Sequence, residues 1–93
     1  MKVQLTKLAA KDLEEISTYI RQKFGEKHAK ELLDSAQNCL SLLAQFPLLG
    51  SIQFPERQIR GVQVTALTRA FYVVKPGKVV VLRLRDGRTN WRG

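Results

Sequence analysis

The chain has 93 residues, of which 44% are hydrophobic and 26% charged, and its formal net charge at pH 7 is +8. This composition predicts one globular domain spanning residues 1–93 and excludes an intrinsically disordered chain. The single cysteine, Cys39, excludes an internal disulfide framework and fits a reducing compartment. No apolar run reaches the roughly 20 residues that cross a bilayer, and no signal-peptide pattern follows Met1. We therefore expect a cytoplasmic protein without membrane contact.

The first half of the chain predicts one short strand followed by two helices. Residues 2–5 alternate as an edge strand does, and Thr6 is placed to cap the helix that follows. Apolar residues recur at spacings of three and four over residues 8–24 and again over 26–46, with Gly25 between the two runs. So short a link predicts an antiparallel helical hairpin.

The second half predicts strands. Residues 48–58 contain proline and glycine with little periodicity, and we expect a loop there. Strands are predicted over residues 61–66, 69–74 and 79–85, with a turn at Lys75-Pro76-Gly77-Lys78 before the last of them. The order is β-α-α-β-β-β, and the predicted fold is α+β, with an antiparallel sheet packed against an N-terminal helical hairpin.

The positive charge is concentrated in this second half. Residues 1–50 carry a net charge of +1, whereas residues 51–93 carry +7, with nine bases against Glu56 and Asp86. Seven of the nine bases are arginines, and the planar guanidinium suits bidentate contacts to phosphate or carboxylate. This distribution predicts a polyanionic partner, either nucleic acid, an acidic protein or both. The alternative is a solvated basic surface that only aids solubility.

The alternation in the last strand indicates where two of the arginines point. A period of two predicts two faces, with Val80, Leu82 and Leu84 on one and Val79, Val81, Arg83 and Arg85 on the other. Two like charges on one strand face repel each other, so an anionic partner is the better explanation for Arg83 and Arg85.

Nothing in the sequence indicates a metal, a cofactor or a nucleophile. One histidine and one cysteine cannot form a metal site of the usual kinds, and no phosphate-binding glycine loop is present. We expect His28 to lie on the surface and Cys39 to pack in the core.

Arginines and aromatic residues of the last third are the candidate binding residues. Guanidinium groups neutralise phosphates or carboxylates, and an aromatic ring beside them can stack on a base. We expect Tyr72 to belong to the core, and Arg60 has an alternative role in an exposed ion pair with Glu56. Trp91 is as easily a packing residue as a contact to a partner. The candidate partner-binding residues are Arg60, Arg69, Arg83, Arg85, Arg88, Trp91 and Arg92.

Several segments, in order and spacing, resemble the RelE/ParE superfamily of toxins over nearly the whole chain. They are the helix start DLEEIxxYI at residues 12–20, LAQFPLLG at 43–50, Ile59-Arg60, RAFYVV at 69–74, and the last strand with the Arg85-Asp86-Gly87-Arg88 that follows it. The segment LAQFPLLG and the long helical hairpin are most similar to the ParE-like branch.

The resemblance implies the toxin of a type II toxin–antitoxin pair, held in a hetero-oligomer by a small acidic antitoxin. ParE-like members inhibit DNA gyrase, whereas RelE-like members cleave mRNA on the ribosome, and the two share one fold. In an RNase, Arg60, Arg69, Arg85 and Arg88 would hold the scissile phosphate. A nucleic-acid-binding module without toxicity is the third alternative.

One departure from the family pattern favours the ParE-like alternative. Many members carry histidine where this chain has Asp86, and histidine can act as a general acid or base near neutral pH. An exposed aspartate there would be ionised and a poor proton donor. We therefore expect a gyrase-binding inhibitor rather than an enzyme.

Overall fold

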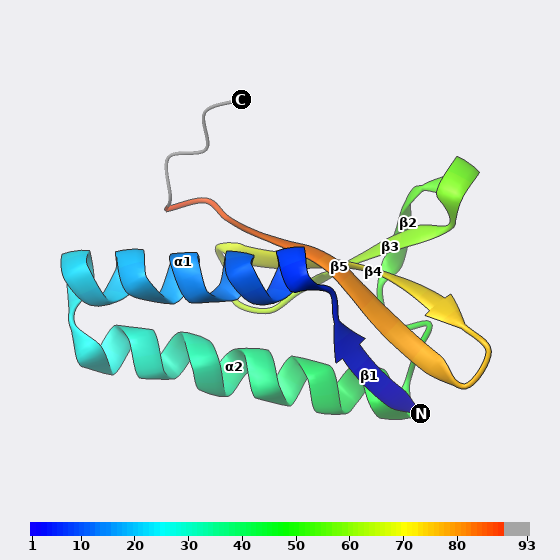
Figure 1. Cartoon of the computed structure of the whole chain (residues 1–93), viewed down its shortest axis with the longest axis horizontal. Helices are drawn as coiled ribbons and strands as arrows, with labels where there is room; N and C mark the ends of the chain where they lie inside the picture. The colour runs from blue at the N-terminus through cyan, green and yellow to red at the C-terminus, as the bar shows by residue number, and fades with distance from the viewer. Residues whose placement is uncertain (89–93) are drawn as a thin grey trace.

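A computed structural model describes residues 1–88, which form a helical hairpin packed against one five-stranded sheet (Figure 1). Strand β1 (Lys2–Leu5) leads into helices α1 (Lys7–Phe24) and α2 (Glu26–Gln45). The chain continues through β2 (Ser51–Phe54), the short helix η1 (Pro55–Arg57), β3 (Ile59–Gln63), β4 (Thr68–Lys75) and β5 (Lys78–Asp86). The α+β class and the predicted order of elements are confirmed.

Two features predicted from the sequence, a cap at Thr6 and a break at Gly25, define the helical hairpin. The side chain of Thr6 caps α1 by accepting a hydrogen bond of 3.0 Å from the Ala9 amide. Gly25 separates the helices with a φ of 96°, a backbone conformation that side chains disfavour. Figure 1 shows α1 and α2 antiparallel and side by side, with both chain ends of the hairpin near the sheet.

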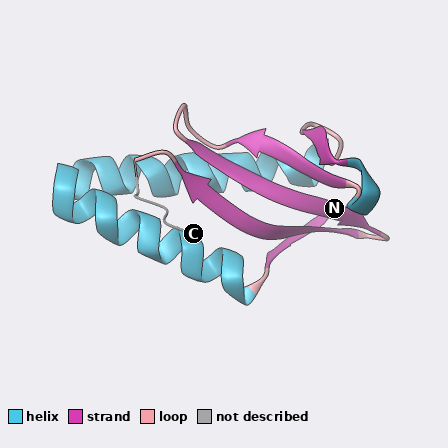
Figure 2. Cartoon of the chain, turned by 90° about the horizontal axis from the view of Figure 1, so that it is seen from above, coloured by secondary structure: helices cyan, strands magenta, loops and turns pink. Residues whose placement is uncertain are grey.

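The sheet has the order β1-β5-β4-β3-β2, and the helices cover one of its faces (Figure 2). The core combines Ile16 and Ile20 from α1, Leu32 and Leu43 from α2, and the fully buried Tyr72 from β4. Tyr72 donates a hydrogen bond of 2.8 Å to the Pro47 carbonyl and accepts one of 2.8 Å from the Gly50 amide. The expected core positions of Tyr72 and Cys39 are confirmed.

The prediction of a plain loop over residues 48–58 was wrong, because β2 and η1 lie within it. β2 is a short edge strand with a bulge between Ile52 and Phe54, so its burial does not alternate and leaves no period-two pattern. The sheet is also mixed, since β1 pairs with β5 in the parallel direction.

The predicted faces of the last strand were only partly right. Tyr72 pairs with Val81 and Phe71 with Arg83, so Leu82 is an extra residue that forms a bulge in β5. After the bulge the alternation of β5 is shifted by one residue, so the positions that face the core change from odd-numbered to even-numbered residues. Arg83 and Arg85 share a face, as predicted, but the core face carries Val79 and Val81 before the bulge and Leu84 and Asp86 after it.

No helix within residues 1–88 is long and apolar enough to cross a membrane.

Candidate functional site

The sheet face opposite the helices gathers three of the seven candidate residues. Arg69 of β4 lies directly opposite Arg85 of β5, and Phe71 lies opposite Arg83. Side chains of directly opposite residues on antiparallel strands are neighbours, with Cβ atoms about 5 Å apart. The register of β4 and β5 therefore places two arginines side by side, where their like charges repel each other.

These strands enclose one side of a shallow hollow of about 170 Å³. Aromatic and aliphatic side chains form its floor, and arginine side chains border it. The ring centroids of Phe54 and Phe71 are 6.2 Å apart. The Arg69 guanidinium lies over the Phe71 ring, 5.9 Å from its centroid, within the range of a cation–π contact. We call this the arginine-rimmed hollow, and its lining residues are Phe54, Ile59, Phe71, Leu82, Arg83 and Arg85.

Arg69 has an unused hydrogen-bond donor next to this hollow. Its Nε atom is buried and makes no hydrogen bond. A buried donor without a partner has a free-energy cost of about 1–3 kcal/mol. The hollow itself is lined by apolar side chains together with Arg83 and Arg85, so it suits a ligand that brings both an apolar group and a carboxylate or phosphate.

Arg83 is held by α1 rather than being available as an open cation. Its Nε and one terminal nitrogen donate to the two carboxylate oxygens of Asp12, at 2.7 and 3.0 Å. Asp12 also accepts a hydrogen bond of 3.0 Å from the Leu84 amide, beyond the point where β1 stops pairing with β5. The sequence-based explanation that an anionic partner accounts for Arg83 is thus corrected: its partner is Asp12, whose place in the fold only the tertiary structure shows.

Asp12 is ionised in spite of its burial. Burial alone would raise the pKa of Asp12, but the hydrogen bonds from Arg83 and from the Leu84 amide outweigh it, and the nearby charges of Arg83 and Arg85 add to their effect. The pKa therefore lies below its ordinary value of 3.8. A buried carboxylate thus fixes the position of one wall of the hollow.

Asp86 is buried, which corrects the expectation that it is exposed. Its carboxylate accepts a hydrogen bond from the Thr68 hydroxyl and others from Arg88 at 2.8 Å and 3.1 Å. Burial would raise the pKa of Asp86, but the bonds from Arg88 and Thr68 together hold it below 3.8. The prediction of an ionised group is supported, although the cause is hydrogen bonding rather than exposure.

Arg60 and Arg88 lie away from the arginine-rimmed hollow. Arg60 of β3 lies opposite Tyr72 of β4 in the strand register, which places it on the helix side of the sheet. Its guanidinium donates a hydrogen bond of 2.7 Å to the Gly50 carbonyl. It therefore stabilises the loop before β2, and the suggested pair with Glu56 is not its contact. Arg88 is bound to Asp86 and borders α2 near His28. The five candidate arginines within residues 1–88 thus do not form one cluster.

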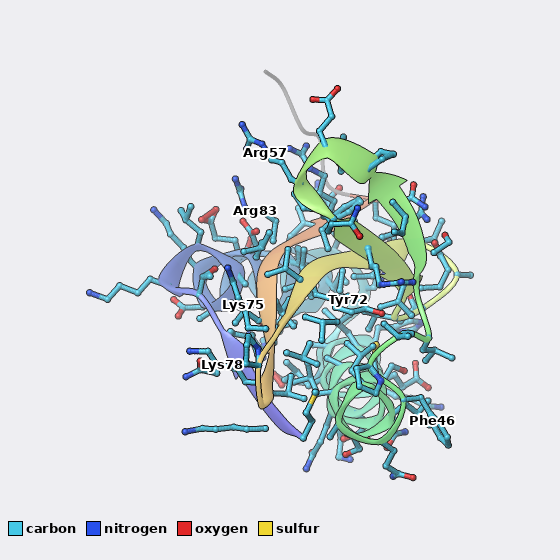
Figure 3. The ribbon with its side chains drawn as sticks, turned by 90° about the vertical axis from the view of Figure 1, so that its right-hand side faces the viewer. Phe46, Arg57, Tyr72, Lys75, Lys78 and Arg83 are labelled. Carbon is cyan, nitrogen blue, oxygen red and sulfur yellow. The ribbon has the colours of Figure 1, made fainter. Side chains whose placement is uncertain are left out.

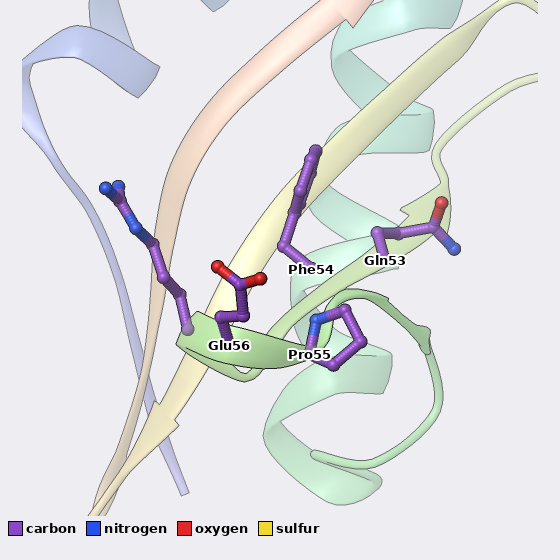
Figure 4. A pocket seen from close by; sticks show the side chains of 5 residues that line it. Gln53, Phe54, Pro55 and Glu56 are labelled. Atoms are coloured by element: carbon purple, nitrogen blue, oxygen red, sulfur yellow. The ribbon is translucent and has the colours of Figure 1, made fainter.

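A second hollow of about 190 Å³ lies at the β2–η1 junction (Figure 4). Its lining comprises Gln53, Phe54, Pro55, Glu56 and Arg57. Phe54 contributes to both hollows, so the apolar floor extends toward η1. Figure 3 shows Arg57 and Arg83 at the same end of the molecule in that view.

Some predicted residues are elsewhere or outside the described part of the chain. Trp91 and Arg92 fall within residues 89–93, which the structure does not describe. His28 is exposed, as expected, and its ring lies 6.1 Å from that of Phe24. Across residues 1–88, no three His, Cys, Asp or Glu side chains are placed to hold a metal ion.

The sequence reasoning missed Asp12 and the apolar floor of the hollow. Phe71 could have been found, because alternation with the core residue Tyr72 places it on the face of Arg69. Phe54 had no such signal, since it lies beside the bulge in an irregular edge strand.

Comparison with known proteins identifies the family. The model of the ParE toxin of the type II toxin–antitoxin system parDE matches residues 3–91. The chain belongs to the ParE toxin family. Among solved structures, a chain of the chromosomal ParDE toxin–antitoxin system from P. aeruginosa has a TM-score of 0.77 and 21% identity, with 92% of this chain and 95% of that chain covered. This likeness shows that the ParE-type fold is shared.

A further solution structure, of the conserved hypothetical protein HP0894 from Helicobacter pylori, has a TM-score of 0.48 and 17% identity, with coverage of 92% and 93%. No curated protein sequence matches the chain. As a ParE-family member, the chain is the toxin of a type II toxin–antitoxin system, and an antitoxin is its partner.

Proposed function

We propose that this ParE-family toxin inhibits growth by binding DNA gyrase through the arginine-rimmed hollow, and that an acidic antitoxin neutralises it. The observation that carries the proposal is the placement of Arg69 directly opposite Arg85, beside the aromatic rings of Phe54 and Phe71. Such a surface suits a protein partner that presents a carboxylate next to an apolar side chain. Gyrase as the target follows from the resemblance to ParE-like toxins.

The state of Asp86 favours this proposal over RNA cleavage. Its pKa is lowered by Arg88 and Thr68, so the carboxyl group is ionised near neutral pH and holds no proton to donate. General acid catalysis of phosphodiester cleavage uses a group that donates a proton to the leaving oxygen, and Asp86 is unsuited to that role.

The test is induction of the toxin alone, followed by two assays on the same culture. We expect growth arrest with DNA fragments covalently linked to gyrase, while ribosomal mRNA stays intact. Cuts at fixed codon positions in mRNA within minutes, without gyrase-linked DNA, would overturn the proposal in favour of an endoribonuclease.

An mRNA endonuclease is the second candidate, because the side-by-side placement of Arg69 and Arg85 also suits a phosphate. In that case Arg85→Ala should abolish the mRNA cuts and leave growth unaffected. A protein that only binds nucleic acid would cause no growth arrest at all, and this result would contradict both candidates.

A further inference from the structure

The side chain of Phe54 borders two hollows of the surface. It lines the arginine-rimmed hollow and also the hollow of about 190 Å³ at the β2–η1 junction, which is formed by residues 53–57 and which we call the tip hollow. Phe54 is 54% exposed, and Figure 4 shows its side chain standing up between those of Gln53 and Glu56. A partner that fills the arginine-rimmed hollow therefore contacts a ring that also borders the tip hollow.

The turn that forms the tip hollow has a fixed backbone. Gln58 ends η1 with a φ of 55°, in the left-handed region that residues with a side chain seldom adopt. Its main-chain and side-chain amides both donate hydrogen bonds to the Pro55 carbonyl, at 3.2 and 2.9 Å. Such conformations persist where surrounding contacts hold them, and they are concentrated at functional sites. A turn that is already ordered also loses little conformational freedom when a partner binds.

The two hollows differ in charge. Arg83 and Arg85 border the arginine-rimmed hollow, whereas Glu56 and Arg57 border the tip hollow with one charge of each sign. Figure 3 shows Arg57 and Arg83 at the same end of the molecule. An acidic partner over the arginine-rimmed hollow is therefore attracted by Arg57 and repelled by Glu56.

We propose that the segment of gyrase bound by the toxin carries an acidic residue for the arginines and an apolar side chain that enters the tip hollow, so that the partner encloses the Phe54 ring from both hollows. This inference rests on the proposed function, which names gyrase as the target. The occupant follows from continuity, because a partner in the arginine-rimmed hollow already contacts Phe54. Aromatic side chains that a partner can enclose are frequent binding hot spots. The tip hollow thus selects among acidic segments, since one without the apolar side chain gains only charge pairs.

The role of the ring is tested by the dissociation constant of each toxin variant with purified DNA gyrase, measured by calorimetry. Phe24→Ala is the matched control for Phe54→Ala, because Phe24 is 50% exposed and ends α1, far from β2 (Figure 1). We expect Phe54→Ala to bind at least about tenfold more weakly and the control to bind within about twofold of wild type. The loss should be the same factor at 0.1 and 0.5 M salt, because burial of apolar surface is not screened as charge pairs are.

Two adjacent charges test the tip hollow by itself, since neither Glu56 nor Arg57 lines the arginine-rimmed hollow. We expect Arg57→Gln to weaken gyrase binding about threefold and Glu56→Gln to strengthen it about twofold at 0.1 M salt. Both effects should shrink at 0.5 M salt. A purely structural role of the turn would instead change affinity in the same direction in both variants, and that result would overturn the inference.

The occupant of the tip hollow is identified directly by photo-crosslinking. The photoreactive residue p-benzoylphenylalanine replaces Gln53, which lines the tip hollow but not the arginine-rimmed hollow, or Phe24 as the control. On irradiation with gyrase we expect a crosslink from position 53 and none from position 24. Mass spectrometry of the crosslinked gyrase peptide should show an acidic residue close to apolar ones, and a peptide without an acidic residue would contradict the inference.

The outcomes separate this inference from the proposed function. Circular dichroism establishes that each variant is folded, and the charge variants and the crosslink decide the question if Phe54→Ala is not. Wild-type affinity in a folded Phe54→Ala, or no crosslink from position 53, would overturn the inference while gyrase binding by the wild-type toxin stays intact. No binding of gyrase by the wild-type toxin would instead contradict the proposed function itself.

Discussion

At the scale of single residues, Asp12 joins α1 to the end of β5. The carboxylate completes the hydrogen bonding of the Leu84 amide where β1 has ended, and it fixes the guanidinium of Arg83. Beyond Val81, where β1 no longer pairs with it, β5 forms the edge of the sheet. An unprotected edge exposes amides and carbonyls that can pair with other chains. Thr6 acts in the same way, since its hydroxyl donates a hydrogen bond of 2.9 Å to the Leu82 carbonyl.

We predict that Asp12→Asn lowers the free energy of unfolding by about 1–3 kcal/mol, because Arg83 and the Leu84 amide lose a charged acceptor. Urea denaturation at pH 7 measures the change. Glu14→Gln is the control, because Glu14 is an exposed acid on the same helix. Equal losses in the two variants would show that the Asp12 contacts do not stabilise the fold.

The two buried carboxylates also predict how stability depends on pH. Asp12 and Asp86 have folded-state pKa values below the ordinary value of 3.8, so below about pH 5 the unfolded chain binds more protons than the folded one. Their contribution is complete above that pH and is lost as the pH falls through the lowered pKa values.

We therefore expect the free energy of unfolding to fall from about pH 5 downward, and to fall less steeply in Asp86→Asn. Urea denaturation between pH 7 and pH 2 gives both profiles. The same slope in the variant and the wild type would mean that Asp86 does not contribute to the acid response.

At the scale of elements, the loop between α2 and β2 is packed closely against the sheet. A Cβ atom on Gly50 would lie 2.5 Å from the Gly61 carbonyl oxygen and 2.9 Å from the Tyr72 ring. Tyr72 and Arg60 both hydrogen-bond this loop, so there is little freedom for it to move aside.

We predict that Gly50→Ala destabilises the protein by about 1–3 kcal/mol, as overpacking of a tight site does. The melting temperature is the measurement, and Gly87→Ala is the control, because its nearest neighbour would be at 3.7 Å. A melting temperature for Gly50→Ala equal to that of the control would refute the close packing.

The sequence predicted the elements well where burial is periodic and poorly where it is not. Both helices and β4 have regular apolar spacing and were found. β3 was predicted over residues 61–66 but runs over Ile59–Gln63, and β5 was found although Leu82 interrupts its alternation. β2 and the bulge at Leu82 break the period of two, so the edge strand and the core face of β5 were missed. The contacts of Arg83 with Asp12 and of Arg60 with Gly50 join residues distant in sequence, and no local pattern shows them.

At the scale of the whole molecule, two groups of exposed side chains lie apart. Arg83 and Arg85 of β5 line the arginine-rimmed hollow. The exposed Phe46, Leu48 and Leu49 follow the end of α2, and Figure 3 shows Phe46 away from Arg83.

The most direct test of this account is the amount of gyrase-linked DNA recovered from cells after induction of toxin variants. The variant Arg69→Gln/Arg85→Gln removes the pair of charges at one end of β4 and β5, and Lys75→Gln/Lys78→Gln removes the equivalent facing pair at the turn. We predict that wild type and the lysine variant yield gyrase-linked DNA and that the arginine variant, although folded, yields none. Wild-type amounts from the arginine variant, or no gyrase-linked DNA from the wild-type toxin, would contradict the account.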